Sequence, residues 1–437
     1  MDNKQTNDDK NIAAGRRRFI GSMATLGAFF IVPRSVLGGR GYIAPSDKIN
    51  LGFIGAGRQS SGLMTVFNRN NAVQIIAASD PYQDKLLGFC KQSDQLYSNR
   101  KGNDYASCKP YQDFMEILSL KAVDAVVIGS PDHWHAVHVV KAVEAGKDVY
   151  CEKPLSLSID EGRKMANATR KHKRILQTGS MQRSWPEFTQ AVKLIRNGYI
   201  GELKTVKVSV GGPPKPYDLI EQPIPSGVDW NMWLGPNAYV PYHQDLAPPL
   251  GSKMWAQWRA YKGLGGGDLS DWGAHMFDIV QWAMGMDESG PVKILWPDGK
   301  DLKYLTMVYA NGVQVSHEDF GRKHAIRFTG TKGEIDLARK FLETNPAALK
   351  TQVIPRNDQL VLESRDHYDN WITAIHSRKD PVCNVETGHR SASVCNLALI
   401  AYELKRSLTW DPQKEHFVND PEANGMKKRR LNAKWGI

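Results

Sequence analysis

The chain has 437 residues, of which 41% are hydrophobic and 24% are charged, a composition typical of a soluble globular protein with more than one domain. The net charge of +11 is concentrated at the ends: the first 40 residues and the last 17 each carry +4, and the 380 residues between them carry only +3. This distribution argues against the basic stripe that a nucleic-acid groove needs, so we expect no nucleic-acid partner.

The first predicted element is a basic and then apolar segment, "GRRRFIGSMATLGAFFIV". Its apolar part of about fourteen residues would rise about 21 Å as a helix, short of the ~30 Å hydrocarbon core, so a signal peptide fits better than a stable membrane anchor. Arg16-Arg17-x-Phe19-Ile20 resembles the twin-arginine signal, which exports folded proteins. We predict a signal peptide over 1–40 and a periplasmic or otherwise extracytoplasmic protein; a basic tail with a buried hydrophobic segment is the alternative.

From about residue 48, short apolar runs alternate with amphipathic stretches. The runs that predict buried strands are 49–55, 73–79, 123–130 and 147–153, and the predicted helices are 61–69, 82–95, 111–120 and 134–145. This alternation is typical of an α/β fold, and it predicts a Rossmann domain with a doubly wound parallel sheet over 48–180.

The segment "GFIGAGRQSSG" (52–62) follows the first predicted strand and leads into a helix. Gly55 and Gly57 match the first two glycines of G-x-G-x-x-G, and Ser60 stands where the third is expected. These glycines allow a tight turn and a close approach of a pyrophosphate to the helix start. Arg58 and Gln59 either contact the phosphates or form the exposed first turn of the helix.

Asp80 ends the second predicted strand, where an acid can bind a ribose 2′-hydroxyl. Because an acid there disfavours a 2′-phosphate, NAD is expected rather than NADP. Asp80 could instead cap the next helix, and one side chain could serve both purposes.

"SPDHWHA" (130–136) ends the strand predicted at 123–130. Since open α/β sheets bind ligands at this edge, Ser130, Pro131 and His135 are candidate cofactor contacts. His133 and His135 do not share a helix face, and no carboxylates stand at ligand spacing, so we expect no metal. The cysteines form no C-x-x-C pair and are expected to be single buried thiols: Cys90, Cys108, Cys151, Cys383 and Cys395.

After about residue 180 the pattern becomes strand-rich, at 202–212, 305–318 and 324–337. Asn311-Gly312 and Lys332-Gly333 are typical hairpin turns. We therefore predict an α+β domain with an open, mostly antiparallel sheet over 181–410, a last helix at 396–408 and a C-terminal tail over 411–437.

In "GGGDLSDWGAHMFD" (265–278), Asp271 and His275 stand four residues apart, so a helix would place them on one face. An apolar stripe follows a second face: Trp272, Met276, Ile279, Val280 and Ala283. As an alternative to a catalytic pair, Asp271 could be a helix cap and His275 a core histidine.

Five features follow one another along the chain: the Rossmann half, "PDHWHA", "EKPLS", "QTGSMQRS" and "GGGDLSDWGAHMFD". In this order they resemble the Gfo/Idh/MocA family of sugar oxidoreductases over most of 48–410. The resemblance implies that Lys153, Asp271 and His275 form the catalytic centre and that the bond before Pro154 is cis. It also implies the remaining contacts: Glu152, Lys153, Gln182, Trp258 and Arg259 with the cofactor, and Arg183 and Trp272 with the substrate.

These residue types suit the oxidation of a secondary alcohol. His275 can take the hydroxyl proton, since an unperturbed histidine has a pKa of about 6.5. The Lys153 ammonium can stabilise negative charge on the reacting oxygen, and Asp271 can orient the sugar or the imidazole. The three glycines are expected to bring the backbone close to the ligand.

The sequence thus predicts an NAD(P)-dependent oxidoreductase acting on a secondary hydroxyl of a sugar or glycoside. Because free NAD is not expected outside the cytoplasm, the cofactor should be tightly bound. The alternatives are an NAD-dependent glycosidase or lyase that works by transient oxidation and elimination, and a non-catalytic sugar-binding protein. Lys153 and Asp271 favour the oxidoreductase, since the glycosidase relatives lack both. The family's open sheet commonly pairs between subunits, so a homo-oligomer is expected.

Overall fold

The computed structural model describes residues 47–101, 107–252, 254–355, 361 and 363–437. The export signal predicted for 1–40 lies outside the described residues. Within the described ranges, the helices are too short or too polar for any of them to span a membrane.

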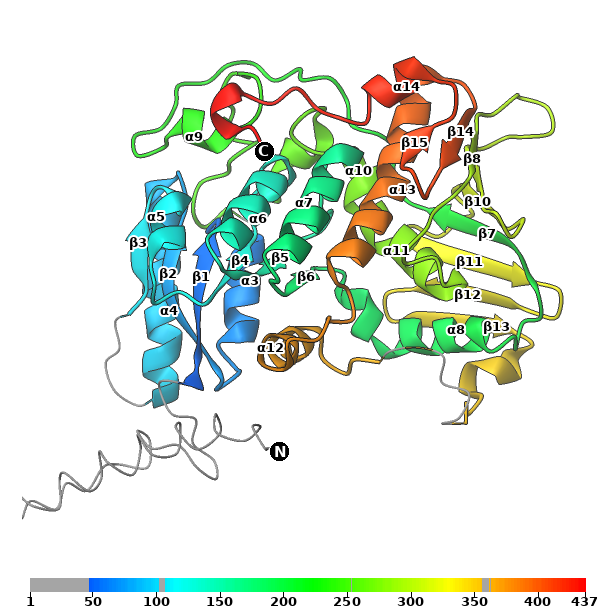
Figure 1. Cartoon of the computed structure of the whole chain (residues 1–437), viewed down its shortest axis with the longest axis horizontal. Helices are drawn as coiled ribbons and strands as arrows, with labels where there is room; N and C mark the ends of the chain where they lie inside the picture. The colour runs from blue at the N-terminus through cyan, green and yellow to red at the C-terminus, as the bar shows by residue number, and fades with distance from the viewer. Residues whose placement is uncertain (1–46, 102–106, 253, 356–360, 362) are drawn as a thin grey trace, which may run out of the picture. The chain divides into compact units, whose positions relative to one another are not determined.

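A six-stranded parallel sheet, sheet A, has the strand order β3-β2-β1-β4-β5-β6 (Figure 1). Its strands are β1 (Ile49–Ile54), β2 (Val73–Ser79), β3 (Lys109–Tyr111), β4 (Ala125–Ile128), β5 (Asp148–Cys151) and β6 (Leu176–Thr178). The order reverses between β1 and β4, and open sheets form a ligand crevice at the carboxyl ends of such strands. The doubly wound parallel sheet predicted from the sequence is therefore confirmed.

Helices cover both faces of sheet A. One face packs against α3 (Arg58–Phe67), α4 (Gln83–Lys101) and α12 (His367–Ser377). The other packs against α5 (Phe114–Ser119), α6 (His135–Glu144) and α7 (Ile159–Lys171). Both cores consist of fully buried aliphatic and aromatic side chains, as a parallel sheet requires.

A nine-stranded mixed sheet, sheet B, follows with the order β13-β12-β11-β7-β10-β9-β8-β14-β15. Its strands are β7 (Leu203–Ser209), β8 (Lys293–Leu295), β9 (Thr306–Val308), β10 (Gln314–His317), β11 (Ala325–Gly330), β12 (Glu334–Ala338), β13 (Phe341–Asn345), β14 (Leu408–Asp411) and β15 (His416–Phe417). Only the pairing of β10 with β7 is parallel among the described strand pairs of this sheet, so the mostly antiparallel second sheet is also confirmed.

Three helices pack on one face of sheet B: α8 (Pro186–Arg196), α11 (Gly273–Met284) and α13 (Val385–Leu404). Helix α13 lies between α7 and the strands of sheet B (Figure 1). It begins eleven residues before the predicted 396, because Asn384 caps it and its first turns carry buried polar side chains that do not look like an apolar stripe.

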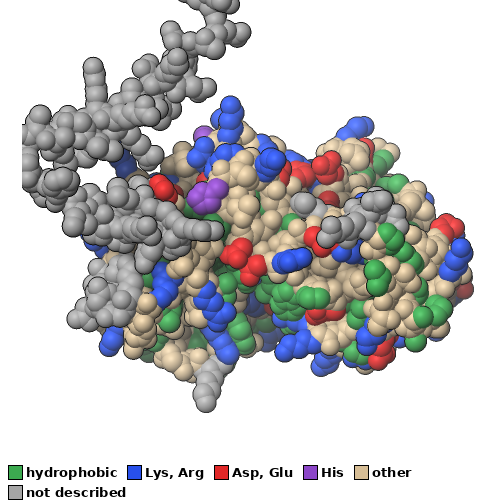
Figure 2. All heavy atoms as spheres, turned by 90° about the horizontal axis from the view of Figure 1, so that it is seen from below, with side chains coloured by type: hydrophobic (Ala, Val, Ile, Leu, Met, Phe, Trp, Pro, Cys, Tyr) green, Lys and Arg blue, Asp and Glu red, His purple; other side chains and the backbone are tan. Residues whose placement is uncertain are grey.

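Acidic and basic side chains are interspersed on the face drawn in Figure 2.

Residues 411–437, predicted as a tail, are folded. Strand β15 extends sheet B, and α14 (Pro421–Gly425) follows. The Trp435 ring then packs 4.9 Å from that of Trp134, and Arg429 pairs with Glu161 of α7 at 2.6 Å. Trp435 and Arg429 therefore connect this end of the chain to the Rossmann domain.

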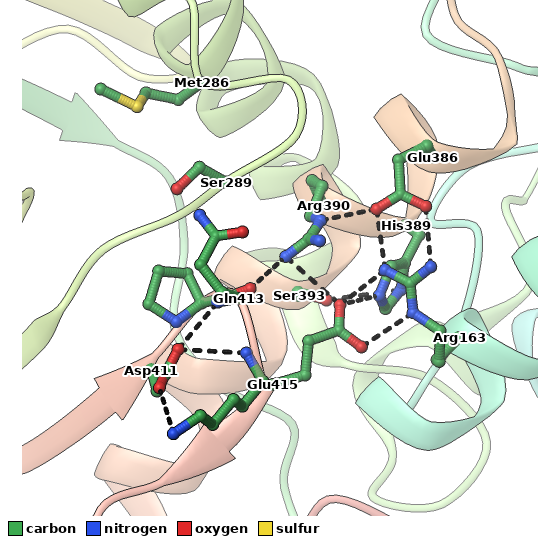
Figure 3. Close-up of polar contacts among 12 residues, drawn as sticks. Arg163, Met286, Ser289, Glu386, His389, Arg390, Ser393, Asp411, Gln413 and Glu415 are labelled. Atoms are coloured by element: carbon green, nitrogen blue, oxygen red, sulfur yellow. Dashed lines mark hydrogen bonds and ion pairs between the residues drawn. The ribbon is translucent and has the colours of Figure 1, made fainter.

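A cluster of charges joins α7 to α13 and the β14–β15 turn (Figure 3). Arg163 of α7 donates to both oxygens of Glu386 and both of Glu415. The buried His389 ring contacts Glu415, and Arg390 Nε donates to Glu386 at 2.7 Å. This cluster connects the Rossmann helices to the second domain.

The cluster should make stability depend on acid pH. Although burial opposes ionisation, Arg163 and Arg390 lower the pKa of Glu386 from 4.5 to about 2. The folded state thus takes up this proton later than the unfolded state, so the contribution is complete above pH 4.5 and is lost as the pH falls toward 2. Unfolding temperatures measured across this range should fall less steeply in Glu386→Gln than in the wild type. The control Glu144→Gln, at an exposed pair, should keep the wild-type slope.

Candidate functional site

Two adjoining cavities lie at the carboxyl edge of sheet A. The larger cavity, about 780 Å³, is lined by Lys153, Asp271 and His275 among others. The smaller cavity, about 270 Å³, is lined by the glycine loop after β1 and by Asp80. They share Gln59, Gly129, Ser130, Trp255, Ala256 and Arg259. A ligand with two linked parts could therefore occupy both.

The smaller cavity begins at the first turn of α3. Gly55 has φ +92°, and a Cβ there would lie 2.7 Å from the backbone nitrogen of Ser130. A Cβ at Gly57 would meet no atom within 4 Å, so this residue faces open space. Helix α3 has no side-chain cap bond and no acidic residue in its first turn. The N–H groups of this first turn can bind a pyrophosphate, as the glycine motif predicts.

Ser60 explains the incomplete motif. It is fully buried, and a Cβ on Gly129 at the end of β4 would lie 2.3 Å from its Oγ. The third glycine of the motif normally allows close packing of helix against strand. Here the glycine follows the strand and the serine lies on the helix, and the two are in close contact.

Asp80 supports the glycine loop from the next strand. Ala56 N–H donates to its Oδ2 at 2.7 Å, and Tyr82 N–H donates to its Oδ1 at 2.8 Å. A carboxylate has further lone pairs, so a ribose hydroxyl can still donate to it. Burial raises the pKa of Asp80, and nearby Lys85 opposes that rise.

Lys153 and Asp271 form an ion pair in the larger cavity. Lys153 Nζ donates to Asp271 Oδ1 at 2.6 Å and to the Asp271 carbonyl at 3.0 Å. That carbonyl is available because the helix is interrupted: α10 (Gly267–Asp271) ends and α11 begins at Gly273. The His275 N–H bonds to the Trp272 carbonyl instead. The stretch predicted as one helix thus forms two helices, and the break between them leaves the Asp271 carbonyl able to accept a hydrogen bond from Lys153.

His275 lies on the first turn of α11, 3% exposed. Its Nδ1 has no hydrogen-bond partner among the described residues, although it is buried. Burial and then the charge of Lys153 lower the pKa of His275 well below 6.5. The ring is therefore neutral at pH 7 and able to accept a proton.

His135 and Glu152 hold the segment around Lys153. His135 Nδ1 lies 2.8 Å from the Pro154 carbonyl, directly after the cis Lys153–Pro154 bond. Burial lowers the pKa of His135 to about 4, so it remains neutral. Gln59 Nε2 donates to Glu152 Oε1 at 3.0 Å, which connects α3 to the end of β5. His135, which itself lines the larger cavity, therefore fixes the residue that follows Lys153.

Two predicted contacts do not line either cavity. Arg183 is 1% exposed and forms ion pairs with Asp278 and Asp287, both at 2.8 Å. The neighbouring Gln182 is also buried and accepts a bond from Arg339. The order of motifs suggested a place in the cleft, but the acidic partners on and after α11 hold Arg183 in the protein interior.

The remaining predicted residues border the cavities. The smaller cavity is lined by Gly55, Gly57, Arg58, Gln59, Asp80, Ser130, Pro131, Trp258 and Arg259, and the larger one by Gln59, Ser130, His135, Glu152, Lys153, Arg259, Asp271, Trp272 and His275. Trp272 is stacked on His324 with ring centroids 3.6 Å apart, so it is more than the first residue of the apolar stripe.

The three glycines serve the protein's own packing. A Cβ on Gly265 would lie 2.7 Å from the Arg259 backbone, and one on Gly267 would lie 2.5 Å from the Pro214 nitrogen. Gly267 lines the larger cavity, but its missing side chain makes room for the chain. For Gly267, which lines the larger cavity, the expected close approach to a ligand stays a prediction.

Sequence reasoning missed several cavity residues. Asp132, within the quoted "SPDHWHA", is 4% exposed, and its Oδ2 has no partner among the described residues. Burial raises the pKa of Asp132 well above its usual value. Trp255 lies over Arg58 at 4.5 Å between the cavities. Arg339, which also lines the larger cavity, lies on the turn after β12, and no sequence motif indicated this residue.

Comparisons with known proteins agree with this architecture. The family model described as "Oxidoreductase family, NAD-binding Rossmann fold" matches residues 49–180. The model described as "Oxidoreductase family, C-terminal alpha/beta domain" matches residues 193–437.

Curated relatives are distant. The rhizopine catabolism protein MocA of Rhizobium meliloti is 27% identical over 55% of this chain and 58% of its own length. The chain thus spans little more than half of that relative. Inositol 2-dehydrogenase 2 of Saccharopolyspora erythraea is 22% identical over 80% of this chain and 92% of its own. Aldose-aldose oxidoreductase from Caulobacter crescentus, a solved structure, superposes with a TM-score of 0.57 at 19% identity, covering 83% of this chain and 99% of that one, and shares the fold.

Proposed function

This chain belongs to the oxidoreductase family defined by these two domains, and we propose that it oxidises a secondary hydroxyl of a sugar or glycoside with a nicotinamide cofactor. One observation carries the proposal: Lys153, Asp271 and His275 share a cavity that adjoins the cavity lined by the glycine loop. When bound, the nicotinamide supplies the hydride acceptor.

Three side chains of the larger cavity have separate roles in the proposed reaction. His275 takes the hydroxyl proton on a ring nitrogen, because its low pKa keeps it neutral at pH 7. The Lys153 ammonium stabilises the negative charge that develops on the substrate oxygen. Asp271 fixes that ammonium through two oxygens, and Arg259 Nε lies 3.4 Å from the same carboxylate.

NAD is the cofactor that the smaller cavity favours. The Asp80 carboxylate on its wall would repel a 2′-phosphate and accept a bond from a 2′-hydroxyl. NADH should bind more tightly than NADPH, and Asp80→Asn, which removes the charge but keeps one acceptor, should narrow that preference by about tenfold, or about 1.4 kcal/mol. Fluorescence titration with both cofactors measures the ratio. An unchanged ratio would mean that another group selects the cofactor.

We also propose that the cofactor is resident and that the protein is exported with it bound. The walls of the smaller cavity include Leu246–Ser252, Met254–Ala256, Trp258 and Arg259. They come from a segment with its own aromatic core of Trp230, Trp233, Tyr242 and Trp258. Such enclosure supports slow release.

The first experiment records absorbance and fluorescence of the purified protein before and after monosaccharides and glycosides are added. A bound nicotinamide that becomes reduced by a sugar is the expected result. Free monosaccharide released from an aryl glycoside without an acceptor would favour the elimination mechanism instead. A bound cofactor that never changes, with no product, would favour a sugar-binding protein.

A further inference from the structure

Arg339 is presented to the larger cavity by a tight turn. It forms with Lys340 the two-residue connection between β12 and β13, where Ala338 pairs with Phe341. Lys340 has φ +57°, and its N–H donates to the Glu187 carboxylate of α8 at 2.8 Å. The turn is thus fixed to the helix layer, and Arg339 reaches the cavity from sheet B.

The guanidinium of Arg339 is oriented by neutral groups. Its Nε donates to Gln182 Oε1 at 3.2 Å, and its central carbon lies 4.5 Å from the Trp272 ring and 5.2 Å from the Trp185 ring. Among the described residues, no carboxylate oxygen lies within 4.0 Å of it, and its two terminal nitrogens donate no hydrogen bond. The planar fork is held in place, and its two terminal nitrogens make no hydrogen bond to the described residues.

The other cations of the larger cavity are paired. Lys153 and Arg259 both contact Asp271, and Lys215 pairs with Asp218 at 2.8 Å. The charge of Asp271 is therefore already shared between two cations. Asp132, Glu152 and Asp268 also line this cavity, and burial raises the pKa of Asp132 and that of Glu152. Arg339 is therefore the cation of this cavity that has no carboxylate partner among the described residues, and its fork is available to an anion.

A guanidinium fork matches a carboxylate through two parallel hydrogen bonds. We propose that Arg339 binds a carboxylate of the substrate, so that the enzyme acts on sugar acids, such as a uronate or its glycoside, rather than on neutral sugars. This inference rests on the proposed function, since it places the substrate in the cavity of Lys153 and His275. Arg339 is then a specificity-determining residue, not a proton donor or acceptor.

Calorimetric titration of the cofactor-loaded His275→Asn variant tests binding without turnover. The probes are glucuronate and galacturonate, their neutral counterparts glucose and galactose, and glucose 6-phosphate. At least one uronate should bind about ten- to a hundredfold more tightly than its neutral counterpart. Adding Arg339→Gln should remove that difference and leave the weak binding of the neutral sugar unchanged.

Two further variants separate charge recognition from folding. Arg339→Lys keeps the charge but loses the fork, so it should retain part of the uronate preference. Arg170→Gln removes the same charge from an exposed pair on α7 and should keep the full preference. Thermal unfolding of each variant confirms that it is folded.

Equal loss of uronate and glucose binding in Arg339→Gln, or tighter binding of glucose 6-phosphate than of either uronate, would overturn the inference. Cofactor reduction by a neutral sugar in wild-type enzyme, with no preference for uronates, would also overturn it while leaving the proposed function standing. Uronate binding that depends on Arg339, without any cofactor reduction in wild-type enzyme, would support the carboxylate contact of Arg339 but contradict the proposed function, and with it the action on sugar acids.

Discussion

His275→Asn should retain the nicotinamide cofactor and lower the rate of substrate oxidation by about 10²- to 10⁴-fold, the usual contribution of a positioned general base. The side chain lines the larger cavity and lies outside the smaller one, so cofactor binding should not depend on it. Single-turnover reduction of the bound cofactor measures the rate, and its absorbance before mixing measures occupancy. Loss of cofactor together with rate would show that His275 belongs to the cofactor site.

The pH dependence provides a second test of the same residue. Burial and then the Lys153 charge lower the pKa of His275 below 6.5, and a base works only when neutral. The rate should therefore stay constant from neutral pH down through 6.5 and fall only in more acidic solution. Lys153→Met removes the largest of the neighbouring charges that lower this pKa, so the acid limb should move to higher pH while the overall rate falls. Lys141→Met, on an exposed face of α6, should change neither. An acid limb that stays in place in Lys153→Met would mean that His275 does not sense the ammonium.

The sequence predicted the Rossmann sheet well because its central strands are continuous apolar runs, which parallel strands buried on both faces require. Strands β3 and β6 were missed because three residues are too few to form a recognisable run. The hairpins at Asn311-Gly312 and Lys332-Gly333 were found because turn chemistry is local. The start of α13 was missed because its buried polar residues, such as His389, are satisfied by distant groups.

The residues of the candidate site likewise divide into those that the sequence could place and those that it could not. Residues at strand ends, such as Asp80, Ser130 and Lys153, could be placed from the sequence because the sheet topology gathers strand ends at one edge. Arg339 could not, since a turn in sheet B gives no sign of the cavity that it reaches. The interruption of the helix at Trp272 was equally hidden, because four-residue spacing fits both a continuous helix and two short ones.

Arg183→Met should lower the free energy of unfolding by about 3–5 kcal/mol, the cost of leaving a buried charge without its partner. Arg183 donates to both oxygens of Asp278, which is also 1% exposed, and Ser391 of α13 donates to Asp278 at 2.7 Å. Loss of the guanidinium leaves that carboxylate buried with only the serine and without a cation in contact. Urea titration followed by tryptophan fluorescence and circular dichroism measures the change.

The double variant Arg183→Met/Asp278→Leu distinguishes a structural ion pair from a substrate contact. Because apolar residues of similar size can replace a buried pair at little cost, the double variant should recover most of the stability that Arg183→Met loses. If Arg183 acts only through Asp278 and Asp287, the folded fraction of either variant should keep KM near the wild-type value. A KM raised tenfold in both variants, with stability unchanged, would instead return Arg183 to the substrate site that the motif order predicted. The outcome matters for the reaction as well, since Asp278 lies three residues after His275 on α11, and the ion pair fixes the helix from which the base reaches the cavity.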